Sequence, residues 1–410
     1  TALADLVLQS PGAVHLGAGA DLSASGLGSG AALLVTAASL TAEGGALLTT
    51  WNYGETPGSA LRLDIGGAAS FTGGASLNSY TVSTGPSGPV VVNAGSLSLS
   101  GAGALGPSSI NALGETGPPG SVTVQVAQAL DLRGGARIGS SNRSLAEPGL
   151  VSVQARSITA DGQGEATTIG SLASGGGPAA PVEVRASEQI TLRDGGQVFG
   201  STLGGADAGN VTVASPAIEL QGGNGAVTGL FAGALGRGRG GSLVVDAGVL
   251  QILDGARIST TTNSDLGSAG RIAVNADRVL IDGRGRATGI DSYAYGDGGD
   301  AGQVQVLARQ QLELLRGGTI TAGTLGSGSP GTIDVQAGTL RLDGRGAPGS
   351  FTGIAGDALF TGTGAAVTVQ ATRLEVLEGS SISTSTQSAR AGQPLRVVAD
   401  SLLVDGGGNA

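Results

Sequence analysis

The chain of 410 residues contains no cysteine, no methionine and no lysine. Without cysteine, disulfides and thiolate metal sites are excluded. His15 is the only histidine, so a histidine zinc site or a Ser-His-Asp triad lacks its main component. We therefore expect no metal and no cofactor. No apolar run approaches the ~18 residues of a membrane helix, so we also expect no membrane span.

Aromatic rings and positive charge are scarce as well. Phe, Trp and Tyr make up 2% of the residues, which leaves Val, Ile, Leu and Ala to fill the interior. The formal net charge is −10, and the acidic residues are spread along the chain. Because nucleic-acid binding needs a basic patch, we expect no nucleic-acid partner.

Glycine is abundant, with 78 residues, and it punctuates an internal repeat. VTVQATRLEVLEGSSISTST (367–386) aligns with LVVDAGVLQILDGARISTTT (243–262), and IAVNADRVLIDGRGRATGI (272–290) is a second variety. The first apolar residues of successive repeats fall at positions 6, 33, 61, 90, 122, 151, 182, 211, 243, 272, 304, 333, 367 and 395. They define fourteen repeats, here called rungs, that alternate between about 29 and about 32 residues.

Within each rung, apolar residues alternate with polar ones. In the rung that starts at Ile272, three apolar clusters follow one another at 272–276, 279–281 and 290. A period of two indicates strands, so each rung is predicted to hold three short strands. A tight turn with positive φ is expected after the second strand, where Gly or Asp tolerates it. These turns are Asp194-Gly195, Asp254-Gly255, Asp282-Gly283 and Asp343-Gly344.

Three short strands cannot bury an apolar face alone. Stacked rungs, however, pair in parallel about 4.8 Å apart and enclose a common core. The sequence therefore predicts an all-β fold, a right-handed parallel β-helix of about fourteen three-stranded rungs. A single β-helical rod is expected over residues 1–410. Frequent glycine and the lack of an apolar stripe of period 3.6 disfavour helices.

The joints between rungs resemble those of a known family. GADAGNVTV (205–213), GSAGRIAV (267–274) and GDAGQVQV (299–306), with LRDGGQVFGST alternating with LIDGRGRATGI, resemble the repeat region of filamentous-haemagglutinin-like exoproteins. The resemblance covers Leu6 to Asp405. It implies a rod that is secreted by the two-partner route, with an outer-membrane transporter as partner, and that serves as an adhesin, a matrix component or a stalk.

The sequence departs from this family at one point. The Asn-Pro-Asn-Gly type motif of the family's secretion domain is not found, so no secretion domain is recognised. Because an open reading frame begins with Met, Thr1 indicates a processed chain or a piece of a longer one. The family supplies no catalytic residues, and none are carried over.

Several candidate sites also have a scaffold explanation. Glycine-rich loops such as GRGRGG (236–241) lack the GxxxxGK[ST] pattern of a phosphate site. Asp291, Asp297 and Asp300 lie in or near a glycine-rich loop, and calcium prefers six to eight oxygens. The repeat of about thirty residues is not the tandem nonapeptide of calcium-binding β-helices, so a single calcium site is left as an alternative to solvated turn carboxylates. Hydrolysis needs two carboxylates at a set separation, whereas the chain's regular aspartates recur with the rungs, so we expect no enzymatic activity. These aspartates are Asp161, Asp282, Asp343 and Asp405.

Two aromatic pairs are the remaining candidates. Trp51 and Tyr53 lie in TTWNYGE, and Tyr293 and Tyr295 lie in DSYAYGD, followed by Asp297. Exposed rings near acids and amides often contact sugars. These five residues are therefore the candidate glycan contacts, with loop decoration as the alternative.

The predicted function is an extracellular structural or adhesive rod, secreted or held at the bacterial cell surface, as an adhesin or as a filament of a biofilm matrix. No cap is evident at either end of the repeat, so either a longer parent chain continues it or copies associate end to end. Cell-surface or matrix glycans are the expected ligands. The alternative is a carbohydrate-binding or polysaccharide-degrading β-helix protein.

Overall fold

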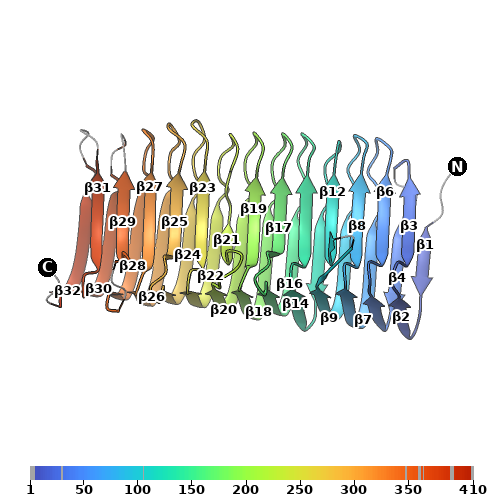
Figure 1. Ribbon diagram of the computed structural model, residues 1–410, viewed down its shortest axis with the longest axis horizontal. Helices are drawn as coiled ribbons and strands as arrows, with labels where there is room; N and C mark the ends of the chain where they lie inside the picture. The colour runs from blue at the N-terminus through green and yellow to red at the C-terminus, as the bar shows by residue number, and fades with distance from the viewer. Residues whose placement is uncertain are drawn as a thin grey trace. The chain divides into compact units, whose positions relative to one another are not determined.

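The computed structural model describes residues 5–28, 31–104, 106–346, 349–358, 362, 364–387 and 392–407. These residues form two compact units, a first unit of Thr1–Ile190 with Asp194–Gly209 and a second of Thr191–Arg193 with Asn210–Ala410. Within each unit, parallel strands stack rung upon rung (Figure 1). The predicted all-β parallel β-helix is thus confirmed. Among the described residues, no helix is long and apolar enough to cross a membrane.

Each rung of the first unit combines a long strand, or two shorter pieces of one, with a short strand. The long series comprises β1 (Leu6–Gln9), β2 (Ala13–Leu16), β4 (Leu33–Ala37), β5 (Ser39–Ala42), β7 (Leu61–Thr72), β9 (Val90–Ser100), β13 (Val122–Val126), β14 (Ala129–Arg133), β16 (Val151–Asp161) and β18 (Val182–Arg193). The short series comprises β3 (Asp21–Gly26), β6 (Leu47–Asn52), β8 (Ser76–Thr81), β12 (Ser109–Gly114), β15 (Arg137–Asn142), β17 (Thr167–Ala173) and β19 (Gly196–Thr202). An antiparallel hairpin, β10 (Ala102–Gly103) and β11 (Gly106–Pro107), precedes β12.

The second unit repeats this plan. Its long strands are β20 (Val211–Gln221), β22 (Leu243–Leu253), β24 (Ile272–Asp282), β26 (Gln303–Leu315), β28 (Thr332–Asp343), β30 (Ala366–Leu377) and β32 (Leu395–Asp405). Its short strands are β21 (Gly229–Phe231), β23 (Arg257–Thr262), β25 (Thr288–Ala294), β27 (Gly318–Thr324), β29 (Gly353–Ala358) and β31 (Ser381–Thr386).

The core of each unit consists of columns of equivalent apolar residues. In the second unit, the register of the short strands aligns one isoleucine per rung, and these side chains are fully buried. They are Ile258, Ile290, Ile320 and Ile354. The same register separates the long strands by the predicted intervals, since Leu243 pairs with Ile272 and Ile272 with Val304. Because every second side chain points inward, a strand shifted by one residue would turn its apolar set outward.

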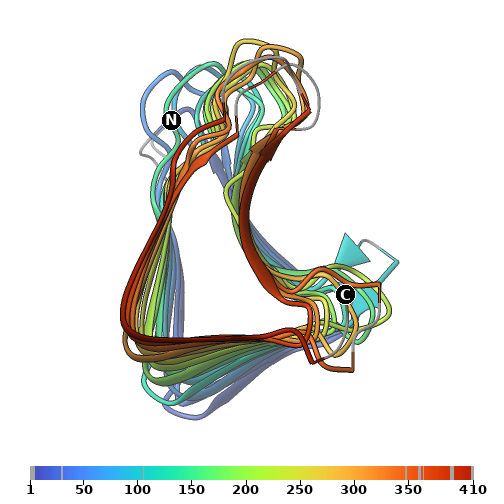
Figure 2. The same ribbon diagram turned by 90° about the vertical axis from the view of Figure 1, so that its left-hand side faces the viewer.

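The prediction of three separate strands per rung is not confirmed. The first two predicted strands run on as one long strand that bends partway along, while the short strand forms a separate part of the rung (Figure 2). The bend contains no positive-φ turn, and parallel pairing continues through it from Ala276 to Arg278 with a local bulge. The right-handed sense of the coil and the single rod over 1–410 stay predictions.

Two kinds of tight turn follow the long strands. In the Asp-Gly turns, Asp194 and Asp254 have φ of 44° and 55°, as predicted. At Asp282-Gly283 the prediction is wrong, because φ is positive two residues later, at Arg284 (49°). The reason is that the Asp282 side chain caps the turn: its Oδ1 accepts a hydrogen bond of 3.2 Å from the Arg284 amide.

The same cap recurs at the other regular aspartates. The Asp161, Asp343 and Asp405 carboxylates each accept from the amide two residues on, at 3.0–3.2 Å. At Asp343-Gly344 the positive φ likewise comes later, at Gly346 (79°), so the prediction is wrong there too. These are the Asp-capped turns.

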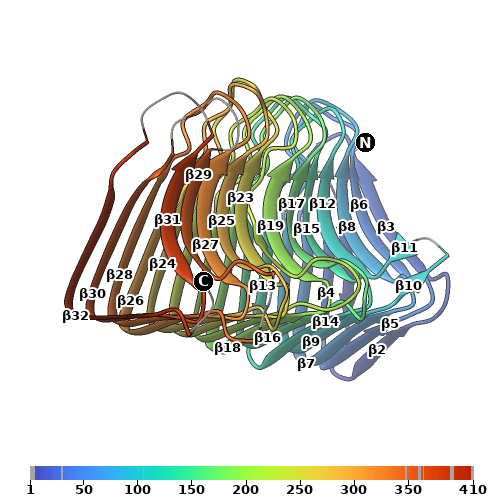
Figure 3. The ribbon, with the colours of Figure 1, turned by 60° about the vertical axis from the view of Figure 1, so that its left-hand side comes forward.

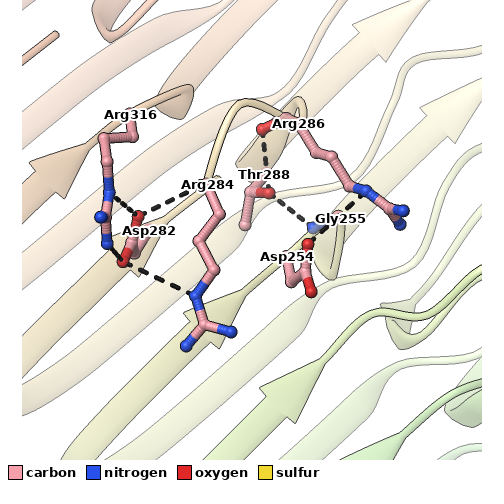
Figure 4. Close-up of polar contacts among 7 residues, drawn as sticks. All are labelled: Asp254, Gly255, Asp282, Arg284, Arg286, Thr288 and Arg316. Carbon is pink, nitrogen blue, oxygen red and sulfur yellow. Dashed lines mark hydrogen bonds and ion pairs between the residues drawn. The ribbon is translucent and has the colours of Figure 1, made fainter. Parts of the chain in front are cut away.

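A threonine joins each Asp-capped rung to the rung before it. The Gly255 amide, in an Asp-Gly turn, donates to Thr288 Oγ1 at 2.7 Å, and Thr288 in turn donates to the Arg286 carbonyl at 3.1 Å (Figure 4). Thr167 accepts in the same way from Gly135 at 2.8 Å, and Thr352 from Gly317 at 2.7 Å. These contacts give the alternation of rung lengths a physical basis, because the two turn types are complementary.

We predict that Thr288→Val destabilises the second unit by about 1–2 kcal/mol, because the half-buried Gly255 amide loses its acceptor on the buried Thr288. Valine keeps the shape of the side chain, so packing is retained. The check is amide hydrogen exchange of the segment around Gly255, together with urea unfolding. Thr261→Val, at an outward-facing position of β23, is the matched control and should have little effect. Equal protection of Gly255 in both variants would contradict the capping role.

Candidate functional site

Three aromatic rings form a column on the outer face of the first unit. Trp51 on β6 lies directly opposite Tyr80 on β8. Their ring centroids are 4.3 Å apart with an interplanar angle of 12°, and Tyr53 stacks on Trp51 at 6.1 Å. Aromatic pairs of this kind stabilise neighbouring strands by roughly 0.2–1 kcal/mol. The rings therefore hold each other, and the faces between them are covered.

Tyr80 was not among the predicted glycan contacts. Its signal in the sequence is its distance from Trp51, because 29 residues is the length of one rung. A residue one rung away is a direct neighbour in space, although it stands alone in the sequence. Burial raises the pKa of Tyr80 above its ordinary value, and a hydrogen bond with Asn78 opposes this shift.

A groove of about 480 Å³ runs beside this column, over the short strands of the first unit. Its lining comes from β3, β6, β8, β12 and β15, and the hairpin β10–β11 contributes Pro107 (Figure 3). The strand register arranges the lining in three rows that run across the strands. The ring row is Trp51, Tyr80 and Leu113, the central row is Ser23, Thr49, Asn78 and Asn111, and the outer row is Asp21, Leu47, Ser76, Ser109 and Arg137.

The central row is a line of hydroxyl and amide groups. The Ser23 and Thr49 hydroxyls lie 2.9 Å apart, and Asn111 Nδ2 donates to Asn78 Oδ1 at 3.5 Å. Asp21 accepts a hydrogen bond from Ser23. Asp21 and Arg137 are the charged residues of the lining and belong to strands at opposite ends of the row. The groove thus combines a polar floor, an aromatic wall and balanced charge.

The second aromatic pair lies in the second unit. The rings of Tyr293 and Tyr295 are stacked at 6.0 Å, and Tyr293 pairs with Gly323 on β27. A Cβ at Gly323 would come within 2.8 Å of Tyr293 Cε1, so glycine makes room for this ring. Burial raises the pKa of both tyrosines. Tyr295 is the more accessible ring, with 46% of its surface exposed.

Asp297 does not join this pair through any contact in the described structure. It is exposed in the loop after β25, where its amide donates to Asp265 Oδ1 at 2.8 Å and its carbonyl accepts from the Ser327 hydroxyl at 2.9 Å. Asp300 likewise ties two loops together, because its Oδ1 accepts from the Ser329 amide at 2.6 Å. Among the described residues, no three acidic or histidine side chains gather as a metal site would require.

Asp291 is a buried carboxylate that sequence reasoning placed in a turn. It lies on β25, is 6% exposed, and accepts a hydrogen bond of 2.5 Å from the Ser259 hydroxyl. The Arg257 guanidinium is 3.9 Å away. Burial raises the pKa of Asp291, and the contacts with Ser259 and Arg257 offset part of that rise. It is thus a strand residue with its own partners.

The regular aspartates serve the scaffold. Asp282 is 5% exposed, and Arg316 from the next rung donates to it from Nε at 2.9 Å (Figure 4). In the neighbouring Asp-Gly turn, Asp254 lies 3.5 Å from Arg286 Nε. These ion pairs join one rung to the next, so the carboxylates are engaged in stacking.

Two further grooves follow the bends of the long strands. The groove in the first unit, of about 820 Å³, is lined by Asn93, Gln125 and Gln154. The groove in the second unit, of about 420 Å³, is lined by Gln336 and Gln370 at the equivalent place in the rung. Because an equivalent groove occurs at the bends of the long strands in both units, we interpret it as a property of the scaffold.

Comparison of the chain with protein-family models, with curated proteins and with solved structures finds no match in any of the three. The resemblance to filamentous-haemagglutinin-like exoproteins therefore stays a prediction from the joints between rungs.

We predict that Asp291→Asn stabilises the second unit relative to the unmodified protein, and that this difference grows as the pH rises. The ordinary pKa is 3.8 and burial raises it in the folded chain, so the unfolded chain loses its proton first. The native state then binds more protons, and stability falls as the pH rises from 3.8 through the raised pKa. Asparagine cannot titrate and escapes this loss.

Urea unfolding of both proteins between pH 3 and pH 7 measures the effect. Above pH 3.8, the unfolding free energy of Asp291→Asn should increasingly exceed that of the unmodified protein. Asp297→Asn, in the exposed loop, is the matched control for the loss of one carboxylate. Parallel curves for Asp291→Asn and the unmodified protein would show that Asp291 ionises as it does in the unfolded chain.

Proposed function

We propose that the chain is an extracellular structural or adhesive β-solenoid that binds glycans without cleaving them. The observation that carries this proposal is the groove of the first unit, which departs from the repeat. Among the described short strands, the line of outward amides beside stacked rings occurs once, at Asn78 and Asn111 next to Trp51 and Tyr80, whereas the polar residues that recur are used in the turns. A repeating scaffold that carries one non-repeating groove is typical of a binding surface on a rigid support.

Binding is favoured over cleavage by the carboxylates of the groove. Hydrolysis of a glycosidic bond uses two carboxyl groups on either side of that bond. The described lining contains one, Asp21, which is hydrogen-bonded to Ser23. The buried carboxylate Asp291 belongs to the other unit. The polysaccharide-degrading alternative therefore lacks its second acidic group in this groove.

Location and partners follow from the resemblance and from exposed strands. Secretion through an outer-membrane transporter is part of the proposal because filamentous-haemagglutinin-like exoproteins use that route. On β32, Leu402 and Val404 are 59% and 67% exposed. A further parallel rung, from a continuing chain or from a second copy, covers a surface of this kind, and end-to-end association of copies is the second of these two possibilities.

We predict that microspheres coated with the protein attach to polysaccharide films and release no sugar from them. The physical reason is that the groove offers contacts for a glycan but no pair of catalytic carboxylates. Retention under flow measures attachment, and reducing ends and unsaturated products in the medium measure cleavage. Microspheres coated with heat-unfolded protein are the control.

Two results would overturn the proposal. Steady release of reducing ends or unsaturated products would identify an enzyme. Retention no better than with the unfolded coating, on neutral and acidic films alike, would remove the adhesive role.

A further inference from the structure

We propose that the groove of the first unit binds an uncharged, linear polysaccharide that lies across the short strands, along the direction in which the rungs stack. This inference rests on the proposed function and specifies its ligand. The groove spans five short strands, from β3 to β15. At ~4.8 Å per strand, that path is on the order of 19 Å, which suits several sugar units in a row and not a single one.

The direction of the ligand follows from the strand pairing. β6, β8 and β12 each pair with a strand on both sides, so their backbone groups are already engaged. An extended peptide that adds to a sheet needs a free strand edge. In this groove only side chains are left to contact a ligand, and those side chains form rows across the strands.

The central row suits hydroxyl groups. Asn78 and Asn111 each carry a donor and an acceptor, and Thr49 carries a hydroxyl that can act as either. The contact between the two amides, at 3.5 Å, is long. Asn78 is 6% exposed and also hydrogen-bonds Tyr80, so Asn111, which is less buried, offers the larger share of its hydrogen-bonding capacity to a ligand. A sugar hydroxyl, which also donates and accepts, matches such a row better than a charged group does.

The ring row supplies the apolar side of the site. Because Trp51 and Tyr80 stack on each other, they present their ring edges as a wall. The C–H faces of a sugar chain can pack along this wall while its hydroxyls meet the amides. In this arrangement a sugar contacts the edges of the stacked rings. Tyr80 becomes part of the site.

Charge selects an uncharged ligand. The lining carries one carboxylate, Asp21, and one guanidinium, Arg137, so its formal charge is balanced. The whole chain has a net charge of −10, which repels polyanions. The two rows also end. In the central row Gly139 follows Asn111, so no amide continues the row on that side. In the ring row Ser25 precedes Trp51, so no ring continues the row on the other side.

Titration calorimetry of the full chain tests this proposal. The probes are cellohexaose, xylohexaose and mannohexaose as neutral chains, and hexagalacturonate and a heparin hexasaccharide as acidic ones. We expect at least one neutral chain to bind, with an affinity that changes less than about twofold between 50 and 300 mM NaCl, because no ion pair is formed. We expect the acidic chains to bind at least tenfold more weakly.

Three variants locate the binding. Asn111→Ala removes one amide from the floor and should weaken binding about three- to tenfold. Trp51→Leu removes the wall and should weaken it further. Asn275→Ala, which removes an outward-facing amide from the second unit, is the matched control and should leave binding unchanged. Circular dichroism and thermal unfolding verify that each variant is folded.

Each alternative outcome has a distinct meaning. The proposal is overturned if no neutral chain binds, if the acidic chains bind more tightly, or if Asn111→Ala and Trp51→Leu bind as well as the control. If these variants lose soluble-glycan binding but their microspheres still attach to the films, the groove assignment stands and adhesion uses another surface. If the variants bind normally while attachment persists, the adhesive function survives and the groove assignment fails.

Discussion

The parallel pairing of each rung with the next is the constraint on which the rest of the structure depends. It places equivalent residues directly above one another, so an inward residue must fit the residues one rung away on both sides. Columns of Val, Ile and Leu satisfy this condition, and large rings do not fit easily in a narrow core. The scarcity of aromatic residues, with Phe71 the largest of the fully buried side chains, reflects the same constraint.

Pairing alone leaves the tight turns with polar groups that need partners, and the two kinds of rung resolve this together. A glycine turn such as Gly134-Gly135, Asp254-Gly255 or Arg316-Gly317 presents an amide, and the threonine of the following Asp-capped rung accepts its hydrogen bond. The Asp-capped turn satisfies its own amide through its carboxylate. A residue such as Thr288 therefore depends on the rung before it, and the true repeat of the chain is two rungs.

The sequence predicted the strands well because their signal is local. Alternation around Ile272 places a strand where β24 begins, and the spacing from Leu243 gives its register. The fusion of two predicted strands into β24 could not be predicted from the sequence, because a bend without glycine does not change the alternation of apolar and polar residues. The shift of the positive φ from Gly283 to Arg284 depends on where the Asp282 side chain points, and composition does not reveal this.

The candidate site was only half visible in the sequence for a related reason. Trp51 and Tyr53 stand out as neighbours along the chain, but Tyr80, Asn78 and Asn111 become their neighbours only through stacking. In a repeat protein, a sequence search therefore has to compare residues one rung apart and look for positions where the column changes chemistry. Most columns here continue or alternate, as the regular aspartates do. The columns through Trp51 and Asn78 instead change from small residues to rings or amides and back within a few rungs, and such a local change is hard to explain by the needs of the scaffold, which are the same in every rung.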